Sequence, residues 1–520
     1  MKSIIYKLVS SVLLFTALLS SCTKDFEKIN TDPINTPNAL PQQLLAPALV
    51  GVVSANMQRN RNFNNELMQV TISITDDEAA VFRYEYRNTY ADYLWNSWYT
   101  QLTNFKDIYN ISSQPLTLNT SYQGISLICQ SWIYSMLTDT YGDLPYFKSN
   151  LAKDSSVYEP GFDKQKDIYL DIFKQLETAN SLLAVGTAIK GSSDPVFSGN
   201  IAKWRKLGNS LYLRLLLKLS GKGEVSTDVI AKIKDIVDTR ASTYPIMASN
   251  DDSALLRWTG GVYISPYQTI REQDWRAPAI GDFFISHLRD WADPRINTST
   301  YGTSGFNRWS IAQGPNGFAG IPSGYLAGTG APKQSYFYSN TSAVTLQTDQ
   351  STGLIMNFSE LQHILAEASV KGFITTGTAQ TYWETGVLSG LTFWLPTWPN
   401  SPVLGMPAVA TTISSPEFRK YLVDADISWN NSLSLDDKME KIHLQKYYSL
   451  FLEDMQQWFE YRRTGHPILP KGTGLRNGGV MPARMTYPVY VQSANPTNYK
   501  EAVANQGPDV ISTQVWWQKF

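Results

Sequence analysis

The first 22 residues constrain this chain most, because they indicate the compartment in which the remainder must fold. Lys2 and Lys7 give a basic start, and residues 4–19 hold an apolar run. The run closes with small residues immediately before Cys22. This order of basic, apolar and small residues is typical of an export signal rather than of a folded element.

The end of this segment is more specific than a plain signal peptide requires. Leucine, two serines and then Cys22 resemble the lipobox of bacterial lipoproteins, which implies that residues 1–21 are a lipoprotein signal peptide and that Cys22 is the lipidation site. The alternative is a retained transmembrane helix, but the run is short of the roughly 20 apolar residues that a span needs. We therefore expect diacylated Cys22 to anchor the chain and the remainder to lie outside the cytoplasm.

Composition narrows the choice of partners and stabilising bonds. Removing Lys2 and Lys7 from the 44 basic residues leaves 42 against 45 acidic ones, a net charge of about −3 that favours no nucleic-acid partner. Only Cys129 remains beside Cys22, so no intramolecular disulfide is expected. Stability must come from a large apolar core.

The domain organisation follows from a change in composition after Cys22. Residues 22–40 are polar and contain Pro33 and Pro37, so they are predicted to form a tether. Residues 41–520 are predicted to form one domain, although length alone would suggest about three, because helical repeat proteins often exceed the usual domain size.

Apolar residues recur at helical spacing through most of residues 41–520. Stripes begin at Leu44 and continue over residues 93–108, 125–136, 168–179 and 444–459, the last predicted to be one helix with basic residues at its end. Residues 360–372, which end in a glycine, and 379–387 are predicted to form a further helical pair. Trp204, Leu207, Gly208 and Leu211 nearly match the tetratricopeptide pattern, in which a small residue lets paired helices interlock. The predicted fold class is all-α, with tetratricopeptide-like helical repeats, long loop-rich insertions and few short strands.

Two irregular stretches interrupt the helices, at residues 260–278 and 301–332. The second holds eight glycines, three prolines and a single charge, yet it also holds several aromatic rings. We expect loop-rich ligand-binding segments near residues 259–345.

No catalytic motif is present: the chain lacks Gly-x-Ser-x-Gly, a phosphate-binding glycine loop and His-Glu-x-x-His. Asp139, Asp143 and the pair Glu453-Asp454 are candidate acid/base carboxylates, although the two acids in residues 138–146 more plausibly cap and shape the exit from a helix. A second constellation lies on residues 360–367, where two glutamates and His363 share a helical face. We interpret it as an exposed polar face rather than as a metal site. No catalytic residue, metal or cofactor is expected.

Several segments carry a further resemblance when they are taken in order. They are Cys22 with residues 25–33, and residues 138–146, 203–214, 293–295, 366–372, 458–465 and 484–499. Together they resemble the SusD/RagB family of outer-membrane surface lipoproteins of Bacteroidota. The chain departs from the pattern at Val491, where an acid is expected.

The resemblance implies four tetratricopeptide-like units, a nutrient-binding role without catalysis, and a SusC-like TonB-dependent barrel transporter as partner at the cell outer membrane. The leading hypothesis is a non-enzymatic, surface-exposed lipoprotein that captures an oligosaccharide and delivers it to this barrel. An oligopeptide is the alternative ligand, and a surface glycoside hydrolase is the alternative from another class.

The family resemblance transfers no binding residue, so the ligand contacts are predicted from ring chemistry. A flat ring stacks on the C–H face of a sugar or on a peptide side chain. Rings on helical stripes, namely Trp98, Trp132, Trp204 and Trp458, are assigned to the core. Rings in irregular segments are the predicted contacts, provided that the two tryptophans share an exposed face: Trp275 and Trp309 first, then Tyr263, Tyr267, Phe306 and Tyr325. Tyr84 and Tyr86 are weaker candidates for an exposed ligand edge. For any one loop ring, the alternative is that it merely pins its loop to the body.

Overall fold

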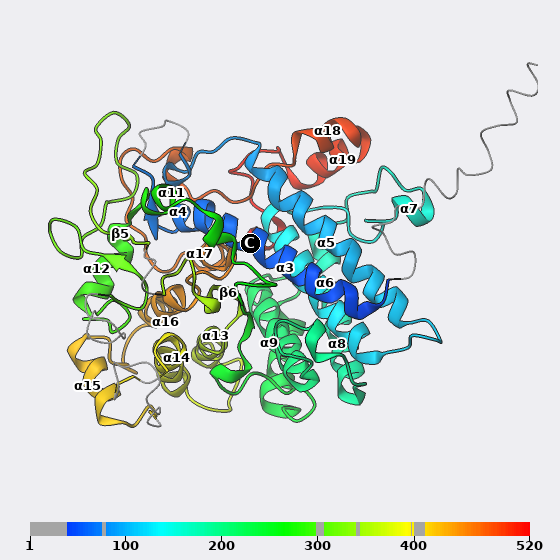
Figure 1. The fold of residues 1–520 in the computed structure, drawn as a ribbon, viewed down its shortest axis with the longest axis horizontal. Helices are drawn as coiled ribbons and strands as arrows, with labels where there is room; N and C mark the ends of the chain where they lie inside the picture. The colour runs from blue at the N-terminus through cyan, green and yellow to red at the C-terminus, as the bar shows by residue number, and fades with distance from the viewer. Residues whose placement is uncertain are drawn as a thin grey trace, which may run out of the picture.

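Helices dominate the protein, as the sequence predicts. This computed structural model describes residues 39–74, 80–297, 306–339, 344–396, 398–399 and 411–519 (Figure 1). The predicted signal peptide, Cys22 and residues 22–38 of the predicted tether lie outside this part of the chain. The assignment of residues 41–520 to one domain stays a prediction.

The N-terminal half forms a layer of long antiparallel helices on one side of the molecule (Figure 1). Its helices, in chain order, are α3 (Pro41–Arg59), α4 (Asn65–Leu67), α5 (Tyr90–Ser112), α6 (Thr120–Tyr141), α7 (Ala152–Ser155), α8 (Gln165–Val185), α9 (Ile201–Leu219) and α10 (Ser226–Lys234). The long helices pack in sequence, α3 on α5, α5 on α6, α6 on α8, α8 on α9 and α9 on α10. This is the serial packing that helical repeats use.

Two local features explain why these helices lie where they do. Asn119 and Asn200 cap α6 and α9 by accepting the backbone N–H groups of Tyr122 and Lys203. Gly208 permits close approach, because a Cβ atom there would lie 2.7 Å from Cδ1 of Ile128 on α6. The small residue of the predicted tetratricopeptide pattern therefore serves the packing of α9 on α6.

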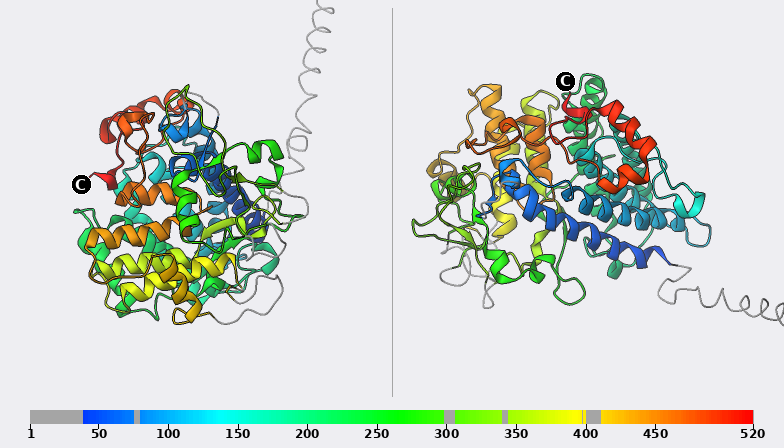
Figure 2. Two further views of the ribbon diagram at one scale, coloured as in Figure 1. Left: turned by 90° about the vertical axis from the view of Figure 1, so that its left-hand side faces the viewer. Right: turned by 90° about the horizontal axis from the view of Figure 1, so that it is seen from above.

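The C-terminal half adds a second group of helices beside the first (Figure 2). They are α11 (Glu272–Arg276), α12 (Asp282–Asp290), α13 (Phe358–Val370), α14 (Ala379–Trp394), α15 (Pro416–Asp424), α16 (Leu435–Ser449) and α17 (Gln456–Thr464). The last two helices, α18 (Val489–Ala494) and α19 (Pro496–Gln506), return to the N-terminal layer and lie next to α5 (Figure 1). Helix α13 is central to this group, since it packs on α14, α16 and α9. It thereby joins the two halves.

Short helical turns complete the helical elements. They are η1 (Asn60–Asn64), η2 (Val81–Arg83), η3 (Gly191–Ser193), η4 (Asp235–Thr239), η5 (Asn250–Asp252), η6 (Pro266–Thr269), η7 (Gln350–Thr352), η8 (Asn477–Gly479) and η9 (Trp516–Gln518). The turn η1 is a π-helix that continues directly from α3.

The prediction of one helix over residues 444–459 is wrong, because the chain turns between α16 and α17. Leu452 and Asp454 adopt positive φ angles of 70° and 28°, which interrupt the helix. The side-chain amide of Asn60 donates to the carbonyl of Asp454 at 2.8 Å, and Asn64 accepts the N–H of Trp458. Both asparagines are buried in η1, so the turn is held by polar groups from the far end of the sequence.

Strands are short and few in the described residues, as predicted. Three antiparallel pairs form: β1 (Thr71–Ile72) with β3 (Ala279–Ile280), β2 (Ala254–Leu256) with β6 (Gly353–Met356), and β4 (Ile311–Ala312) with β5 (Tyr336–Phe337). The β2–β6 pair closes off the segment between α10 and α13, from which most of the irregular chain projects (Figure 1).

One main hydrophobic cluster runs through the described chain, from Leu45 to Trp517. The four tryptophans assigned to the core, Trp98, Trp132, Trp204 and Trp458, are all buried, which confirms that assignment. Cys129 is buried as well and has no disulfide partner.

Candidate ligand-binding site

The irregular segments lie together at the left of Figure 1, at the opposite side of the molecule from the start of α3 and the end of α5. We call the surface formed by residues 257–281, 306–339 and 344–352 the loop face. It carries α11, the β4–β5 pair and all six rings that the sequence predicts as ligand contacts.

The prediction that Trp275 and Trp309 share an exposed face is wrong. Trp309 is fully buried, stacks on Phe284 and lies 4.8 Å from the ring of Phe451 on the turn after α16. Trp275 is 5% exposed and donates its indole N–H to the carbonyl of Tyr338 at 3.3 Å. Both rings are therefore packed between the loops and the helical body, where a ligand cannot reach them.

Tyr267 is also buried, contrary to its assignment as a contact. Its hydroxyl donates to the carbonyl of Met57 on α3 at 3.1 Å, and its ring packs 5.1 Å from that of Trp275. The physical reason is common to the three rings: irregular backbone lying over a helical body buries its large side chains against that body.

Tyr263, Phe306 and Tyr325 are the predicted rings that remain partly exposed. Phe306 packs against Tyr338, with ring centroids 5.5 Å apart. Tyr325 stacks on Phe82 and donates its hydroxyl to the carbonyl of Ser73, so it pins its loop at the same time.

Sequence reasoning missed three further half-buried rings of the loop face, Phe318, Tyr336 and Tyr338. Tyr336 is flanked by two cations: the Lys333 ammonium lies 4.2 Å above its ring, and Arg276 donates to its hydroxyl at 3.1 Å. The available signal was the run of three consecutive rings at residues 336–338, since in a strand the first and third side chains lie on the face opposite the second. The half-buried rings of the loop face are therefore Tyr263, Phe306, Phe318, Tyr325, Tyr336 and Tyr338.

The weaker candidates Tyr84 and Tyr86 are buried, so they form no exposed edge. The hydroxyl of Tyr86 donates to the carbonyl of Arg484 at 2.8 Å. Burial raises the pKa of both tyrosines above the usual range, and they are therefore neutral at physiological pH.

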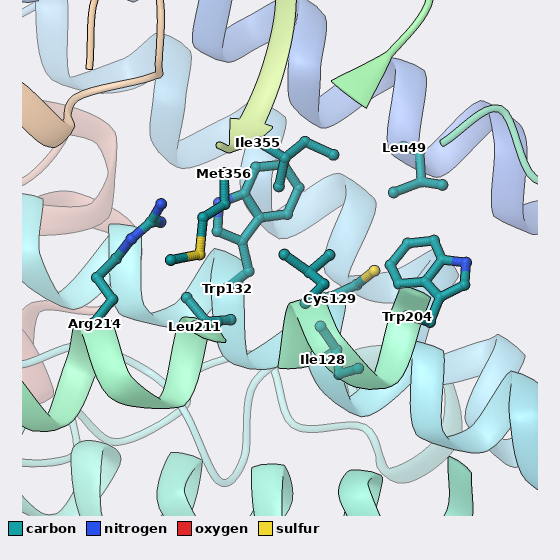
Figure 3. A pocket seen from close by; sticks show the side chains of 10 residues that line it. Leu49, Ile128, Cys129, Trp132, Trp204, Leu211, Arg214, Ile355 and Met356 are labelled. Atoms are coloured by element: carbon teal, nitrogen blue, oxygen red, sulfur yellow. The ribbon is translucent and has the colours of Figure 1, made fainter. Parts of the chain in front are cut away.

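Two cavities inside the described protein are too small to hold a nutrient. One of about 10 Å³ lies between α3, α6, α9 and β6, where Cys129, Trp132 and Leu211 point inward (Figure 3). Another of about 20 Å³ lies beneath the loop face next to Trp275 and Tyr267. A volume of that order holds about one water molecule.

Two open grooves of about 400 and 430 Å³ flank η9 near the C-terminus. Trp516 lines the first and Trp517 the second, together with lysines, several of which form ion pairs. Lys218, for example, forms a buried ion pair with Asp139. Charged and polar side chains make up most of the lining of these grooves, and each groove contains a single Trp, Tyr or Phe ring. The loop face has more partly exposed rings and is therefore the stronger candidate.

The candidate acid/base carboxylates are committed to structural contacts. Asp139 accepts from Tyr169 and Trp517 and pairs with Lys218. Asp143 accepts the backbone N–H of Gln165 at 2.8 Å and so caps the start of α8, whereas the prediction had it cap the exit from its own helix.

Glu453 and Asp454 are buried side by side, with the Arg214 guanidinium as their neighbouring cation. Burial and the nearby charge of Glu360 raise the pKa of Glu453 well above its usual range. Asp143 lines the first open groove, but none of the other three candidate carboxylates lines either groove, so no pair of them flanks a space for a glycosidic bond there.

The interpretation of Glu360, His363 and Glu367 as an exposed polar face is wrong, since all three are fully buried. Glu367 lies with His443 and Glu460 in a cluster whose ligand atoms fall within 4.8 Å of one another, a geometry that a metal could use. Arg463, however, donates to both Glu367 and Glu460, and Lys446 pairs with Glu460.

These cations decide the charge state of the cluster. Although burial alone would raise the pKa of Glu367, the Arg463 guanidinium holds it well below the usual range. The carboxylates are thus ionised and already neutralised by side chains, so the cluster is an internal salt-bridge network rather than a metal site.

The architecture defines a class of protein: a helical-repeat protein of the tetratricopeptide type with a loop-rich, aromatic face. The SusD-like family described as starch-binding and associating with the outer membrane matches residues 33–488. The chain belongs to this family, which confirms the resemblance noted in the sequence.

Solved structures agree with the family assignment. A chitin-binding SusD homologue from Flavobacterium johnsoniae superposes with a TM-score of 0.74 at 20% identity, covering 92% of this chain and 98% of that one. A protein described as chitin-binding gives 0.72 at 24% identity, and a SusD homologue from Bacteroides uniformis gives 0.72 at 22%. Each of these two alignments covers 93% of this chain and 100% of the other. No curated protein matches the sequence.

Membership places the protein in an outer-membrane-associated family. Among the helices of the described residues, none is both long and apolar enough to cross a bilayer.

Proposed function

We propose that the protein is a non-enzymatic surface lipoprotein that captures an oligosaccharide on the loop face and delivers it to a SusC-like TonB-dependent barrel transporter. The observation that carries this proposal is membership of a starch-binding family together with partly exposed rings on one loop-rich face. The chitin-binding neighbours support a glycan as ligand. The proposed anchor is Cys22, which holds the protein at the outer membrane.

The proposed contacts are Tyr263, Phe306 and Tyr325 from the sequence prediction, with Tyr336 and Tyr338 added. Each ring that stacks on a sugar should contribute on the order of 1–2 kcal/mol, since aromatic faces combine a large apolar area with few rotatable bonds. Tyr325 is expected to contribute least, because Phe82 already covers part of its ring.

The test is binding of starch and chitin oligosaccharides by titration calorimetry, with oligopeptides of mixed sequence as the competing ligand class. Tyr263→Ala and Phe306→Ala should weaken oligosaccharide binding about tenfold each without changing the thermal midpoint. The matched control is Tyr158→Ala, a 75% exposed ring outside the loop face, which should bind normally.

The outcomes separate the alternatives. If only peptides bind tightly, the ligand is an oligopeptide and not an oligosaccharide. Release of reducing ends from the bound oligosaccharide, lost on Asp143→Asn, would establish a glycoside hydrolase instead. Binding without turnover supports the proposal.

The transporter partnership is tested separately. We expect purification from native membranes in mild detergent to recover a barrel together with the lipoprotein, in a complex that buries more than about 2,000 Å², as permanent assemblies do. Repeated recovery of the lipoprotein alone would contradict this part of the proposal.

A further inference from the structure

The loop face is more basic than the protein as a whole. Its three segments contain five basic and three acidic residues, a net charge of +2, whereas the whole chain carries −1. Two of the basic residues are neutralised within the face, since Arg308 forms an ion pair with Asp349 and Arg271 pairs with Asp274 at 2.8 Å. The remaining positive charge includes a pair of cations that meet at one ring, Tyr336.

The packing of β5 on α11 brings Tyr336 to the surface (Figure 1). Side chains alternate along a strand, so Phe337 is buried in the core while Tyr336 and Tyr338 lie on the other side and are half-buried. Trp275 fixes α11 here, because its indole N–H donates to the carbonyl of Tyr338 and its ring lies 6.3 Å from that of Phe337. Arg276, the next residue of α11, is thereby placed beside Tyr336.

Lys333 and Arg276 both contact this ring. The Lys333 ammonium lies 4.2 Å from the centroid of the Tyr336 ring and also donates to the backbone carbonyl of Arg276. The guanidinium carbon of Arg276 lies 5.2 Å from the same centroid, and one of its nitrogens donates to the Tyr336 hydroxyl at 3.1 Å. We call these three residues the cationic cluster. Its ring positions two cations and so does more than offer an apolar face.

The described carboxylates compensate only part of this charge. Glu272 pairs with Arg276 at 2.9 Å, but Glu272 is 60% exposed, so water screens the pair. No described carboxylate contributes to the pKa of Lys333, which burial and, secondly, the charge of Arg276 lower from its ordinary value. Residues 76–78, which include three acids, lie outside the described part of the chain. A half-buried cation beside a second cation is destabilised, and an anion bound there would offset this cost.

We propose that the cationic cluster binds an acidic group of the captured oligosaccharide, either a carboxylate or a sulfate ester. This inference rests on the proposed function and deepens it, because it names an anionic glycan as the ligand class. Lys333 and Arg276 offer an ammonium and a guanidinium to one anion, and hydrogen bonds between charged partners are about twice as strong as neutral ones.

The neighbouring rings fit the remainder of such a ligand. Tyr338 lies two residues beyond Tyr336 on the same side of the strand, and the ring of Phe306 packs 5.5 Å from that of Tyr338. A sugar chain that stacks on Phe306 or Tyr338 therefore has its next units beside Lys333 and Arg276. The apolar rings would hold the sugar body, while the cationic cluster selects its charge.

The experiment compares ligands that differ in charge alone. Trigalacturonic acid and its methyl ester have the same sugars and linkages, but only the acid is anionic at neutral pH. Titration calorimetry on the full chain at low salt should show that the acid binds at least about tenfold more tightly than the ester. This preference should shrink at high salt, because the cations are partly exposed.

A second pair of ligands separates the two kinds of anion. It consists of a carrageenan-derived oligosaccharide with sulfate esters and its desulfated form. Preference for the sulfated sugar alone would identify a sulfate as the bound group, and preference for the uronic acid alone would identify a carboxylate. Either result supports the proposal. Equal affinities within both pairs overturn it.

Variants of the cluster test whether this preference belongs to it. Lys333→Met should weaken binding of the acid about tenfold, while binding of the ester and the thermal midpoint stay as in the parent. Lys333→Arg should retain the preference. The matched control is Lys420→Met on α15, which removes a 74% exposed lysine outside the loop face and should bind as the parent does. Equal losses in Lys333→Met and Lys420→Met would show a general effect of net charge and overturn the proposal.

Failure of the proposed function is a different result. In that case no oligosaccharide binds, whatever its charge, and peptides of three glutamates and of three glutamines decide the inference. Preference for the glutamate peptide, removed by Lys333→Met, supports an anion site and assigns it to acidic peptides. Absence of any preference overturns the anion site as well.

Discussion

Arg214 of α9 and Glu360 of α13 form a buried ion pair, in which neither side chain is more than 2% exposed. The guanidinium Nε donates to the carboxylate at 2.7 Å, and a second nitrogen reaches both Glu360 and Glu453. The pair joins the N-terminal helical layer to the C-terminal one. Removal of one partner would leave buried charge without compensation.

We therefore expect Arg214→Met to destabilise the protein by about 3–5 kcal/mol, because Glu360 and Glu453 would lose their cation. Urea unfolding followed by circular dichroism measures the change. The double variant Arg214→Met with Glu360→Met should recover part of this loss. If the single and double variants are equally stable, the pair does not couple the two layers.

Trp309→Ala is expected to unfold the protein more easily rather than to remove a ligand contact. A fully buried large-to-small change of this kind costs about 3–5 kcal/mol. Trp458→Ala should behave alike, since this ring is also fully buried and packs 5.4 Å from Phe63. A Trp309→Ala protein with normal thermal stability and lost oligosaccharide binding would instead restore the original prediction for this ring.

The pH dependence of stability should include a contribution from Glu66 in α4. Burial raises the pKa of its carboxyl to about 7, although the hydrogen bond from the Phe82 backbone N–H and the charge of Arg61 both act to lower it. The native state thus holds the proton more tightly than the unfolded chain, and this stabilisation is full below about pH 4.5 and lost as the pH rises through 7.

Glu66→Gln mimics the neutral form and tests this sign. At pH 8 the variant should be more stable than the parent by about 1–2 kcal/mol, a value that allows for the partial solvent access of the side chain. At pH 4.5 the two should be equally stable in urea titrations. A variant less stable than the parent at pH 8 would show that the charged carboxylate is the favoured native form.

Cys22→Ala should yield protein that is uncut or released, since the thiol that accepts the lipid is lost. Fractionation of membranes in a strain without the barrel partner measures this directly. Partition of the variant into the outer membrane as tight as that of the parent would mean that Cys22 is not the anchor.

The helical layers could be predicted from the sequence because their signal is periodic. Stripes such as residues 93–108 and 125–136 match α5 and α6, and the small residue at Gly208 marks a close helix contact. The spacing of apolar residues did not predict the turn between α16 and α17. The stripe stays in phase across it, and the groups that hold the turn, Asn60 and Asn64, lie almost 400 residues earlier in the chain.

The site was harder to predict for two physical reasons. Trp275 and Trp309 lie in irregular chain, yet that chain covers the helical body and buries them, so absence of periodicity did not mean exposure. Glu360 and Glu367 look like a solvated face, because a single sequence does not show that Arg214 and Arg463 reach them from other helices. Long-range pairing of charges leaves no local pattern.

The pairing of β2 with β6 holds the two ends of residues 257–352 side by side, whatever the length of chain between them. Each doubling of a flexible loop costs only about 0.6 kcal/mol in closure entropy. An insertion or deletion in an exposed tip of this segment, such as residues 326–332, is therefore well tolerated. One within α9 or α13 would move a buried charge out of register with its partner. The loop face can therefore be reshaped at its exposed tips without moving any helix that carries the buried charge pairs.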